Sequence, residues 1–333
     1  MPSLDDFDQT EKLAAVIKQR DQALKRLQKE KQRTQDLVDA VMGAAEVAAS
    51  GVTIVPKPKI KHSKGKEQVA LFHLTDWQIG KQTATYNSEV GQQRVQDFWV
   101  PALTLIQQHR SAVPVKKAVI MLGGDMVEGV GIFPGQAYEV DQYLFDQLFQ
   151  VAAMIRHCVE VALENFEEVW VYEEWGNHGR LGRRGEMPGM DNVDRMAYRI
   201  AQDQLQHDRL TWVTHDSFGN HVQIGEYTAL LVHGDEIRGF GGNLPQYGIM
   251  KKCNGWAAGA YDHPFRDVYM GHYHQVLTMT MASGGQIYVT GSPESDNMYA
   301  KEFVAATGVP SQRLHMIDPY RGRVVSEHII WLD

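Results

Sequence analysis

The chain has 333 residues, of which 43% are hydrophobic and 22% charged, as in ordinary soluble globular proteins. Its formal net charge of −8 argues against a broadly basic nucleic-acid-binding surface, although a local basic track remains compatible with it. No apolar run approaches about 18 residues and the N-terminus has no signal-peptide pattern, so no membrane partner is expected. Two cysteines, Cys158 and Cys253, make no disulfide framework, which favours the cytoplasm.

Residues 1–50 differ in composition from the rest and predict a helical extension. They are rich in Lys, Gln, Arg, Glu and Ala, with no Gly before Gly43. The extension is either a solvated helix without function or a coiled-coil helix that joins copies of the chain or docks a partner. Apolar residues stand at heptad spacing and polar residues interrupt the seam: Ile17, Leu24, Leu27, Val38 and Val41 against Arg20, Lys31 and Thr34.

Residues 51–67 predict an exposed, extended linker. Five lysines and two prolines fall within the eleven residues from Pro56 to Lys66. The segment is either a solvated connection or a contact to a phosphate backbone.

Residues 68–333 predict a catalytic α/β domain. Strands alternate with helices in the first half and follow one another in the second, which indicates two packed sheets flanked by helices. Pro319–Gly322 has the composition of a hairpin turn. The expected helices are 89–109, 140–164 and 190–207, and the expected strands are 69–75, 118–122, 168–173, 210–214, 220–224, 227–233, 267–271, 275–282, 286–290, 312–317 and 323–331.

Five of the hydrophobic runs are followed by polar side chains that can bind metal. Open α/β sheets place their chemistry at the carboxyl ends of strands, so these residues are expected to meet on one rim. A single Gly-Asp pair could equally be a helix N-cap, but the recurrence along the chain favours a metal site. The polar groups are Asp76 and Gln78, Asp125, Asn177 and His178, His233, and His272 and His274.

The donor types limit the metal. Carboxylate and amide oxygens with imidazole nitrogens, and no thiolate, suit Mn²⁺, Mg²⁺, Fe or Zn²⁺. As many as seven of these residues as ligands are too many for one tetrahedral ion but fit two ions that share a carboxylate. Two ions about 3.5–4 Å apart hold both the attacking and the leaving oxygen of a phosphoryl centre, and metal binding makes a bridging hydroxide available at neutral pH.

The order Asp-x-Gln, Gly-Asp-x-x-Glu, Gly-Asn-His, His-Gly and Gly-His-x-His resembles the calcineurin-like metallophosphoesterase superfamily, over about residues 71–292. The resemblance implies a four-layer α/β/β/α sandwich and two divalent ions, of which Mn²⁺ is the first expectation. It also implies that His178 contacts the scissile phosphate and protonates the leaving oxygen. The implied ligands are Asp76, Gln78, Asp125 and His274 for the first ion, and Asp125, Asn177, His233 and His272 for the second, with Asp125 bridging.

Two positions depart from the superfamily pattern. Gln78 stands where Asp-x-His is usual, so it is either a weak ligand that favours Mn²⁺ over Zn²⁺ or a residue behind the ligands. Glu128 stands where the repair nucleases of the superfamily have a histidine that contacts phosphate. The candidate substrate-binding residues are Glu128, Tyr273 and three arginines of the Gly-Arg loop after the Asn-His motif: Arg180, Arg183 and Arg184.

The run from Asp76 to Lys81 resembles the opening motif of SbcD-type DNA exonucleases and their phage-encoded relatives. That resemblance implies a DNA exonuclease or endonuclease acting in a bacterial or host cytoplasm. A phosphatase or small-molecule phosphodiesterase with the same two ions is the alternative enzyme. A binding or scaffold protein, in which Gln78 and Glu128 mark a degenerate site, is the third hypothesis.

Overall fold

The computed structural model describes residues 17–29, 31–32, 35, 55–60, 63–133, 135–182, 184–237, 244–295 and 308–333. The chain divides into two compact units, Met1–Val52 and Thr53–Asp333. In the first unit, residues 17–29 are helical and every one of them is exposed. Part of the expected heptad seam, including Val38 and Val41, lies outside the described residues. Within the described residues, no helix is long and apolar enough to cross a membrane.

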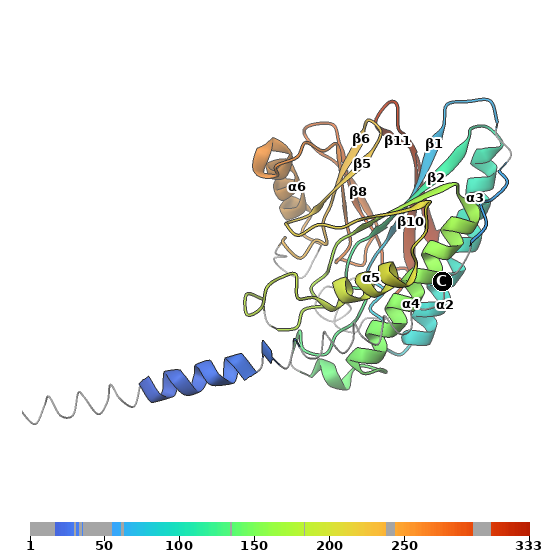
Figure 1. Ribbon diagram of the computed structural model, residues 1–333. Coiled ribbons are helices and arrows are strands. Elements are labelled where there is room, and N and C mark those ends of the chain that lie inside the picture. The colour runs from blue at the N-terminus through green and yellow to red at the C-terminus, as the bar shows by residue number, and fades with distance from the viewer. Residues whose placement is uncertain are drawn as a thin grey trace, which may run out of the picture. The chain divides into compact units, whose positions relative to one another are not determined.

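The second unit contains a six-stranded sheet in which four neighbouring strands are parallel (Figure 1). Two antiparallel strands, joined by the turn expected at Pro319–Gly322, complete one edge of this sheet. The sheet order is β11 (Arg323–Trp331), β10 (Ser311–Asp318), β1 (Gln68–Leu74), β2 (Val115–Leu122), β3 (Glu168–Glu173) and β4 (Leu210–Val213).

A second, five-stranded sheet packs face to face with the first. Its central strands are parallel to each other and its edge strands antiparallel. The order is β5 (Asn220–Ile224), β6 (Tyr227–Leu231), β7 (Asp267–Met270), β9 (Gln286–Val289) and β8 (Leu277–Thr280).

Strand β1 shows how the sequence builds these layers. Val69 and Leu71 pack between the two sheets, in a core that also contains Tyr227 and Tyr269. Phe72 points to the opposite face, because side chains alternate along a strand, and its ring lies 5.0 Å from that of Trp99. Both faces of the first sheet are therefore buried, as its continuous apolar runs predict.

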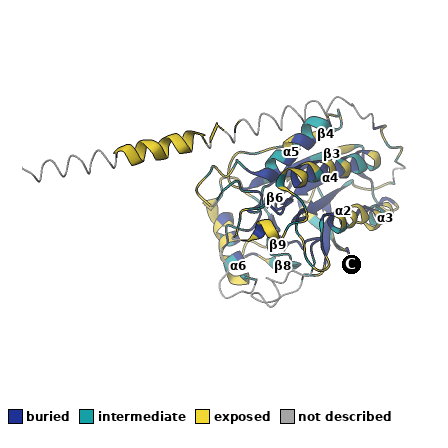
Figure 2. Ribbon diagram, turned by 90° about the horizontal axis from the view of Figure 1, so that it is seen from below, coloured by how far each residue is buried: buried dark blue, intermediate teal, exposed yellow. Residues whose placement is uncertain are grey.

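Helices cover the outer faces of both sheets and complete the four-layer α/β/β/α fold expected from the sequence (Figure 1). Strands labelled β3 and β6 in Figure 2 are largely dark blue, whereas the surrounding helices keep exposed yellow faces. Four helices lie on the first sheet and α6 lies on the second. They are α2 (Ser88–Asp97), α3 (Trp99–Arg110), α4 (Leu144–Asn165), α5 (Val193–Gln204) and α6 (Gln246–Gly255), with short helical turns at η1 (Gln136–Tyr138) and η2 (Trp256–Ala260).

Two helical predictions needed revision. The single helix expected over 89–109 is interrupted between α2 and α3, where Pro101 has no N–H for the preceding turn. The glycine-rich stretch 234–261, in which the sequence predicts no helix, contains α6. Ile249, Cys253 and Trp256 of this stretch are spaced four and three residues apart and pack on the second sheet.

The end of the predicted linker is held against the catalytic unit. Val55 is buried, and the Arg209 guanidinium donates hydrogen bonds to the carbonyls of Val55 and Pro56. Lys57 pairs with Glu167 at 3.0 Å. Residues 55–60 thus have extended backbone but do not behave as a fully solvated connection.

Candidate metal centre

All seven candidate ligands lie on loops that leave the carboxyl ends of five strands. The loops come from both sheets. Within the first sheet the loops after β1 and β2 are joined by backbone hydrogen bonds: Asp76 N–H donates to Gly124 O, and Gln78 N–H donates to Asp125 O, each at 2.9 Å. The rim predicted from the sequence is therefore present. Asp76 and Gln78 follow β1, Asp125 follows β2, Asn177 follows β3, His233 follows β6, and His272 and His274 follow β7.

Asp125, His233 and His272 form the tightest cluster of donor atoms. One ligand atom from each lies within 4.8 Å of the others, and His233 Nε2 is 2.9 Å from Asp125 Oδ2. His233 Nδ1 lies 2.8 Å from the carbonyl oxygen of Gly123, which holds the ring so that Nε2 faces the carboxylate. These residues are three of the four expected around the second ion.

Asp76 and His274 stand together at the expected first site, with His274 Nε2 3.4 Å from Asp76 Oδ1. The Asp76 carboxylate also accepts hydrogen bonds from the backbone N–H of His272, at 2.9 and 3.0 Å, and from the Thr75 hydroxyl, at 2.7 Å. Because the N–H of His272 binds Asp76 directly, the two ligand sets are adjoining parts of one centre.

The donor set fits divalent ions. Asn177 Oδ1 is buried and, among the described residues, has no hydrogen-bond partner, although buried polar atoms normally have one. Oxygen and imidazole donors converge around it without a thiolate, a combination that suits Mn²⁺, Mg²⁺, Fe or Zn²⁺. An ion would supply the missing partner for Asn177 and neutralise the two buried aspartates.

His178 is held at the edge of the centre by Glu128. Its Nδ1 lies 2.8 Å from the Glu128 carbonyl oxygen and 3.2 Å from Glu128 Oε2. Its Nε2 remains on the side of the ligands, 4.0 Å from Asp125 Oδ2. Burial lowers the pKa of His178, but the charges of Asp125 and Glu128 outweigh it and raise that pKa to about 9.

The loops of the centre are held in an unusual backbone conformation. Among the described residues, every non-glycine residue with a left-handed φ is a candidate ligand. Such a conformation costs roughly 1–2 kcal/mol per residue for side chains with a Cβ, so it is normally reserved for glycine. The residues and their φ angles are Asp76 (54°), Gln78 (46°), Asp125 (50°), His272 (66°) and His274 (53°).

Two glycines make room for the carboxylates. A Cβ on Gly176 would overlap the carboxylate of Asp125, and a Cβ on Gly271 would overlap that of Asp76. The Gly-Asn-His and Gly-His-x-His motifs therefore need their glycines for space next to the ligands, not only for turning the chain.

Asp194, which sequence reasoning missed, organises the loop that carries Asp125. Its carboxylate accepts hydrogen bonds from the backbone N–H groups of Asp125, Met126, Val127 and Gly176, at 2.8–3.1 Å. This fully buried side chain thereby joins the loops after β2 and β3. A carboxylate in the first turn of a predicted helix is usually interpreted as stabilising the end of that helix. The sequence therefore gives no sign that Asp194 binds the backbone of two loops distant in the chain.

Glu294 and Lys81 were also missed. Glu294 Oε2 lies 2.6 Å from His274 Nδ1, and the Lys81 ammonium lies 3.3 Å from Glu294 Oε1. Burial opposes ionisation of Glu294, but its contacts with His274 and Lys81 lower its pKa to about 2. Orientation of a ligating imidazole by a carboxylate is a common arrangement behind metal ligands.

The candidate substrate-binding residues take different positions. Arg180 forms an ion pair with Asp235, and Arg184 lies 3.8 Å from the same carboxylate. The Tyr273 hydroxyl is within hydrogen-bond distance of the carbonyls of Gly234 and Ile237, at 3.1 and 3.2 Å. Arg183 lies outside the described residues.

No protein-family model matches the chain, and neither does any curated protein. Its backbone is similar to zinc-bound Vps29 from Entamoeba histolytica, at 11% identity over 79% of this chain and 99% of that one, with a TM-score of 0.32. A metallophosphoesterase from Sphaerobacter thermophilus has 14% identity over 78% and 88%, with a TM-score of 0.30. A dimetal phosphatase from Danio rerio has 11% over 80% and 99%, with a TM-score of 0.34. At such identities and TM-scores the likeness assigns no activity to this chain.

Proposed function

We propose that this chain is a metallophosphoesterase that hydrolyses phosphodiesters with two divalent ions, and that DNA is its substrate. The observation that carries the proposal is the single centre formed by Asp76, Asp125, His233, His272 and His274, with the unpartnered Asn177 oxygen beside it. Ions bound there would act as Lewis acids on the phosphoryl oxygens and lower the pKa of coordinated water. Mn²⁺ is the preferred ion.

Each residue then has a task that its position supports. Asp125 would be a ligand of both ions, since its carboxylate stands in the tight cluster and its backbone carbonyl accepts a hydrogen bond from the N–H of Gln78. His178 donates a proton from Nε2 to the leaving oxygen, because Nδ1 is held by Glu128 and Nε2 lies on the side of the ligands. Glu128 thus orients the acid, a role that does not require a phosphate contact.

A phosphatase or a small-molecule phosphodiesterase would use the same centre. One assay separates the three: the Mn²⁺-loaded protein is offered labelled single- and double-stranded DNA, a bis-aryl phosphodiester and an aryl phosphomonoester. Cleavage of DNA and of the diester, with little turnover of the monoester, supports the proposal. Turnover of the monoester alone would assign a phosphatase. Asp125→Asn serves as the inactive control, and no turnover of any substrate would revive the scaffold hypothesis.

A further inference from the structure

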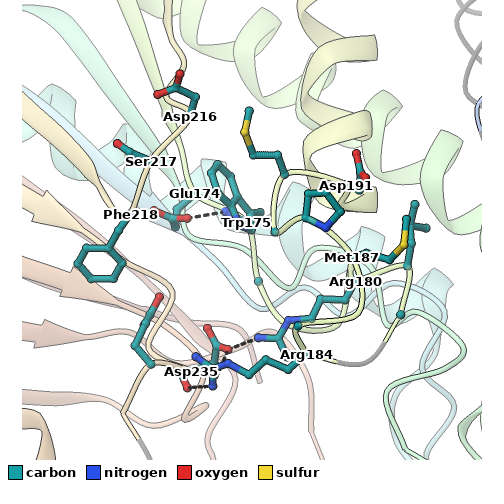
Figure 3. Close-up of a pocket in the computed structure, with 18 of the residues that line it drawn as sticks. Glu174, Trp175, Arg180, Arg184, Met187, Asp191, Asp216, Ser217, Phe218 and Asp235 are labelled. Carbon is teal, nitrogen blue, oxygen red and sulfur yellow. Dashed lines mark hydrogen bonds and ion pairs between the residues drawn. The ribbon is translucent and has the colours of Figure 1, made fainter. Parts of the chain in front are cut away.

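A cavity of about 470 Å³ opens beside the metal centre (Figure 3). Gly176, which lines the cavity, precedes the ligand Asn177 and packs against Asp125. On another side the cavity is lined by Asp235, two residues after the ligand His233. The volume is in the range of small-molecule sites, and the position allows one substrate to reach both the cavity and the ions.

The charges in this cavity oppose a phosphate. Five carboxyl groups line it, against two guanidinium groups, Arg180 and Arg184. Both arginines are directed to Asp235, as the dashed lines in Figure 3 show, so neither is held open for an anion. The phosphate of a substrate therefore belongs at the ions, and the cavity suits a part of the substrate that donates hydrogen bonds. The carboxyl groups are Glu174, Asp191, Asp216, Asp235 and Glu236.

Glu174 provides an acceptor that the protein leaves unused. The side chain is 4% exposed, and its Oε1 accepts a hydrogen bond from the Trp175 N–H at 3.1 Å. Its Oε2 has no hydrogen-bond partner among the residues that the structure describes, and it lies 3.4 Å from Nε2 of His215, an imidazole whose pKa is lowered by burial. A buried acceptor of this kind normally has a donor, and a ligand in the cavity can supply it.

The cavity also offers an aromatic face. Phe218 is 41% exposed, although its ring is supported by Trp256, at 5.2 Å, and by Tyr261, at 6.2 Å. Met187, labelled in Figure 3, and Pro188, both just after the Gly-Arg loop, line the cavity as well. A flat ring that carries N–H donors at its edge matches both the apolar surface and the carboxyl groups.

We infer that this cavity, named here the base pocket, binds a nucleobase with an exocyclic amino group, guanine first, while the adjoining phosphodiester lies at the ions. The inference rests on the proposed function and narrows it to nucleic acid and nucleotide diesters. Guanine fits best, since its N1–H and amino group are adjacent donors, and several carboxyl groups that can accept them line the pocket.

Three diesters with one leaving group test the inference. They are the 4-nitrophenyl phosphodiesters of guanosine, inosine and methanol, so the bond that breaks is the same in each. We expect kcat/KM for the guanosine ester to exceed that of the methyl ester roughly tenfold, the size of one base stacked on an aromatic side chain. Inosine lacks only the amino group and should lie between them. Equal values for all three would overturn the inference.

Variants identify the contacts. Phe218→Leu, which keeps an apolar side chain against Trp256, should lower the preference for inosine over methyl most and leave the preference for guanosine over inosine. Glu174→Met should abolish the preference for guanosine over inosine and keep the preference for inosine over methyl. Trp331→Ala removes an exposed aromatic side chain from β11 and serves as the control that keeps both ratios. Ratios in Phe218→Leu that equal those of the unaltered protein would contradict the inference.

A binding measurement keeps this test separate from the proposed function. Saturation-transfer NMR on the metal-free protein should detect guanosine and lose the signal in Phe218→Leu, whether or not any diester is hydrolysed. Loss of all hydrolysis with guanosine binding intact would refute the phosphodiesterase and retain the pocket. Binding of choline in place of guanosine would overturn the inference in favour of a cationic ligand, and binding of neither would overturn it outright.

Discussion

The Lys81 ammonium lies 2.9 Å from Gln78 Oε1, the atom expected to ligate the first ion. Gln78 Nε2 is directed to His178 Nε2, at 3.4 Å. The amide of Gln78 is therefore placed between a fixed cation and the candidate acid. A divalent ion at this site has to compete with the ammonium for the same oxygen, which favours weaker binding than at the second site, where among the described residues no lysine contacts a ligand.

Replacement of Gln78 tests this competition. Gln78→His should tighten the weaker metal site, more for Zn²⁺ or Co²⁺ than for Mn²⁺, because imidazole is the stronger donor for late first-row ions. Gln78→Ala should weaken the same site and spare the other. Calorimetric titration of the metal-free proteins resolves the two steps, with Gln82→Ala, an exposed glutamine nearby, as the control. If both substitutions leave both steps in place, Gln78 is not a ligand.

Replacement of Asp125 removes a ligand shared by both ions. Asp125→Asn should lower the bound metal below one ion per chain and abolish nearly all turnover. The carboxylate is buried and its pKa is depressed in spite of burial, by His233 and His178, so its charge is part of the centre. Elemental analysis after gel filtration measures the metal, and Asp97→Asn on α2 is the control. Normal metal content with retained activity would refute the bridging role.

Replacement of His178 should separate chemistry from metal binding. His178→Ala is expected to keep the metal stoichiometry and lower kcat by about 10²–10⁴, the usual contribution of a positioned acid. Esters with an activated leaving group should lose less, because their leaving oxygen needs no proton. Exposed His157 on α4 gives the matched variant His157→Ala. Equal losses for good and poor leaving groups would remove His178 from the role of acid.

The raised pKa of the buried Glu173 carboxyl group predicts how the free energy of unfolding depends on pH. Burial raises its pKa to about 7, against the opposing charges of Arg195 and Arg199. The folded state therefore holds a proton that the unfolded state releases near its ordinary pKa of 4.5, and stability falls as pH rises from 4.5 to 7. Glu173→Gln, neutral at every pH, should raise the unfolding free energy at pH 8 by about 2–3 kcal/mol and leave it nearly unchanged at pH 4. Denaturant melts with exposed Glu164→Gln as the control measure both; an equal change at the two pH values would count against this assignment.

Deletion of residues 1–50 tests the extension. The core should stay folded, since the strands that the structure describes start at Gln68 and every candidate ligand follows it. If the helix joins copies of the chain, light scattering should report a lower mass for the truncated protein. An unchanged mass would favour a solvated helix, which agrees with the exposure of Ile17, Leu24 and Leu27.

The sequence indicates the layers and the ligand rim because both arise from local patterns. Apolar runs such as that of β2 mark buried strands, and the polar residues directly after them are placed by the parallel sheet. Asp194 lies 69 residues from Asp125, and Glu294 lies 213 residues from Lys81, so nothing in the local pattern pairs them. Their roles arise only from the packing of loops. Helix α6 was missed because the glycines around it outweighed the apolar positions Ile249 and Cys253, and Trp256 directly after it.

The left-handed backbone of five candidate ligands implies a conflict between metal binding and the stability of the fold. Glycine at Asp76, Gln78, Asp125, His272 or His274 would relieve about 1 kcal/mol of backbone strain and delete a donor atom at the same time. A library of this chain selected only for resistance to heat, with ions withheld, should therefore accumulate glycine or asparagine at these positions. Directed evolution for thermostability would replace metal ligands before it replaced residues of the sheets, unless ions were present during selection.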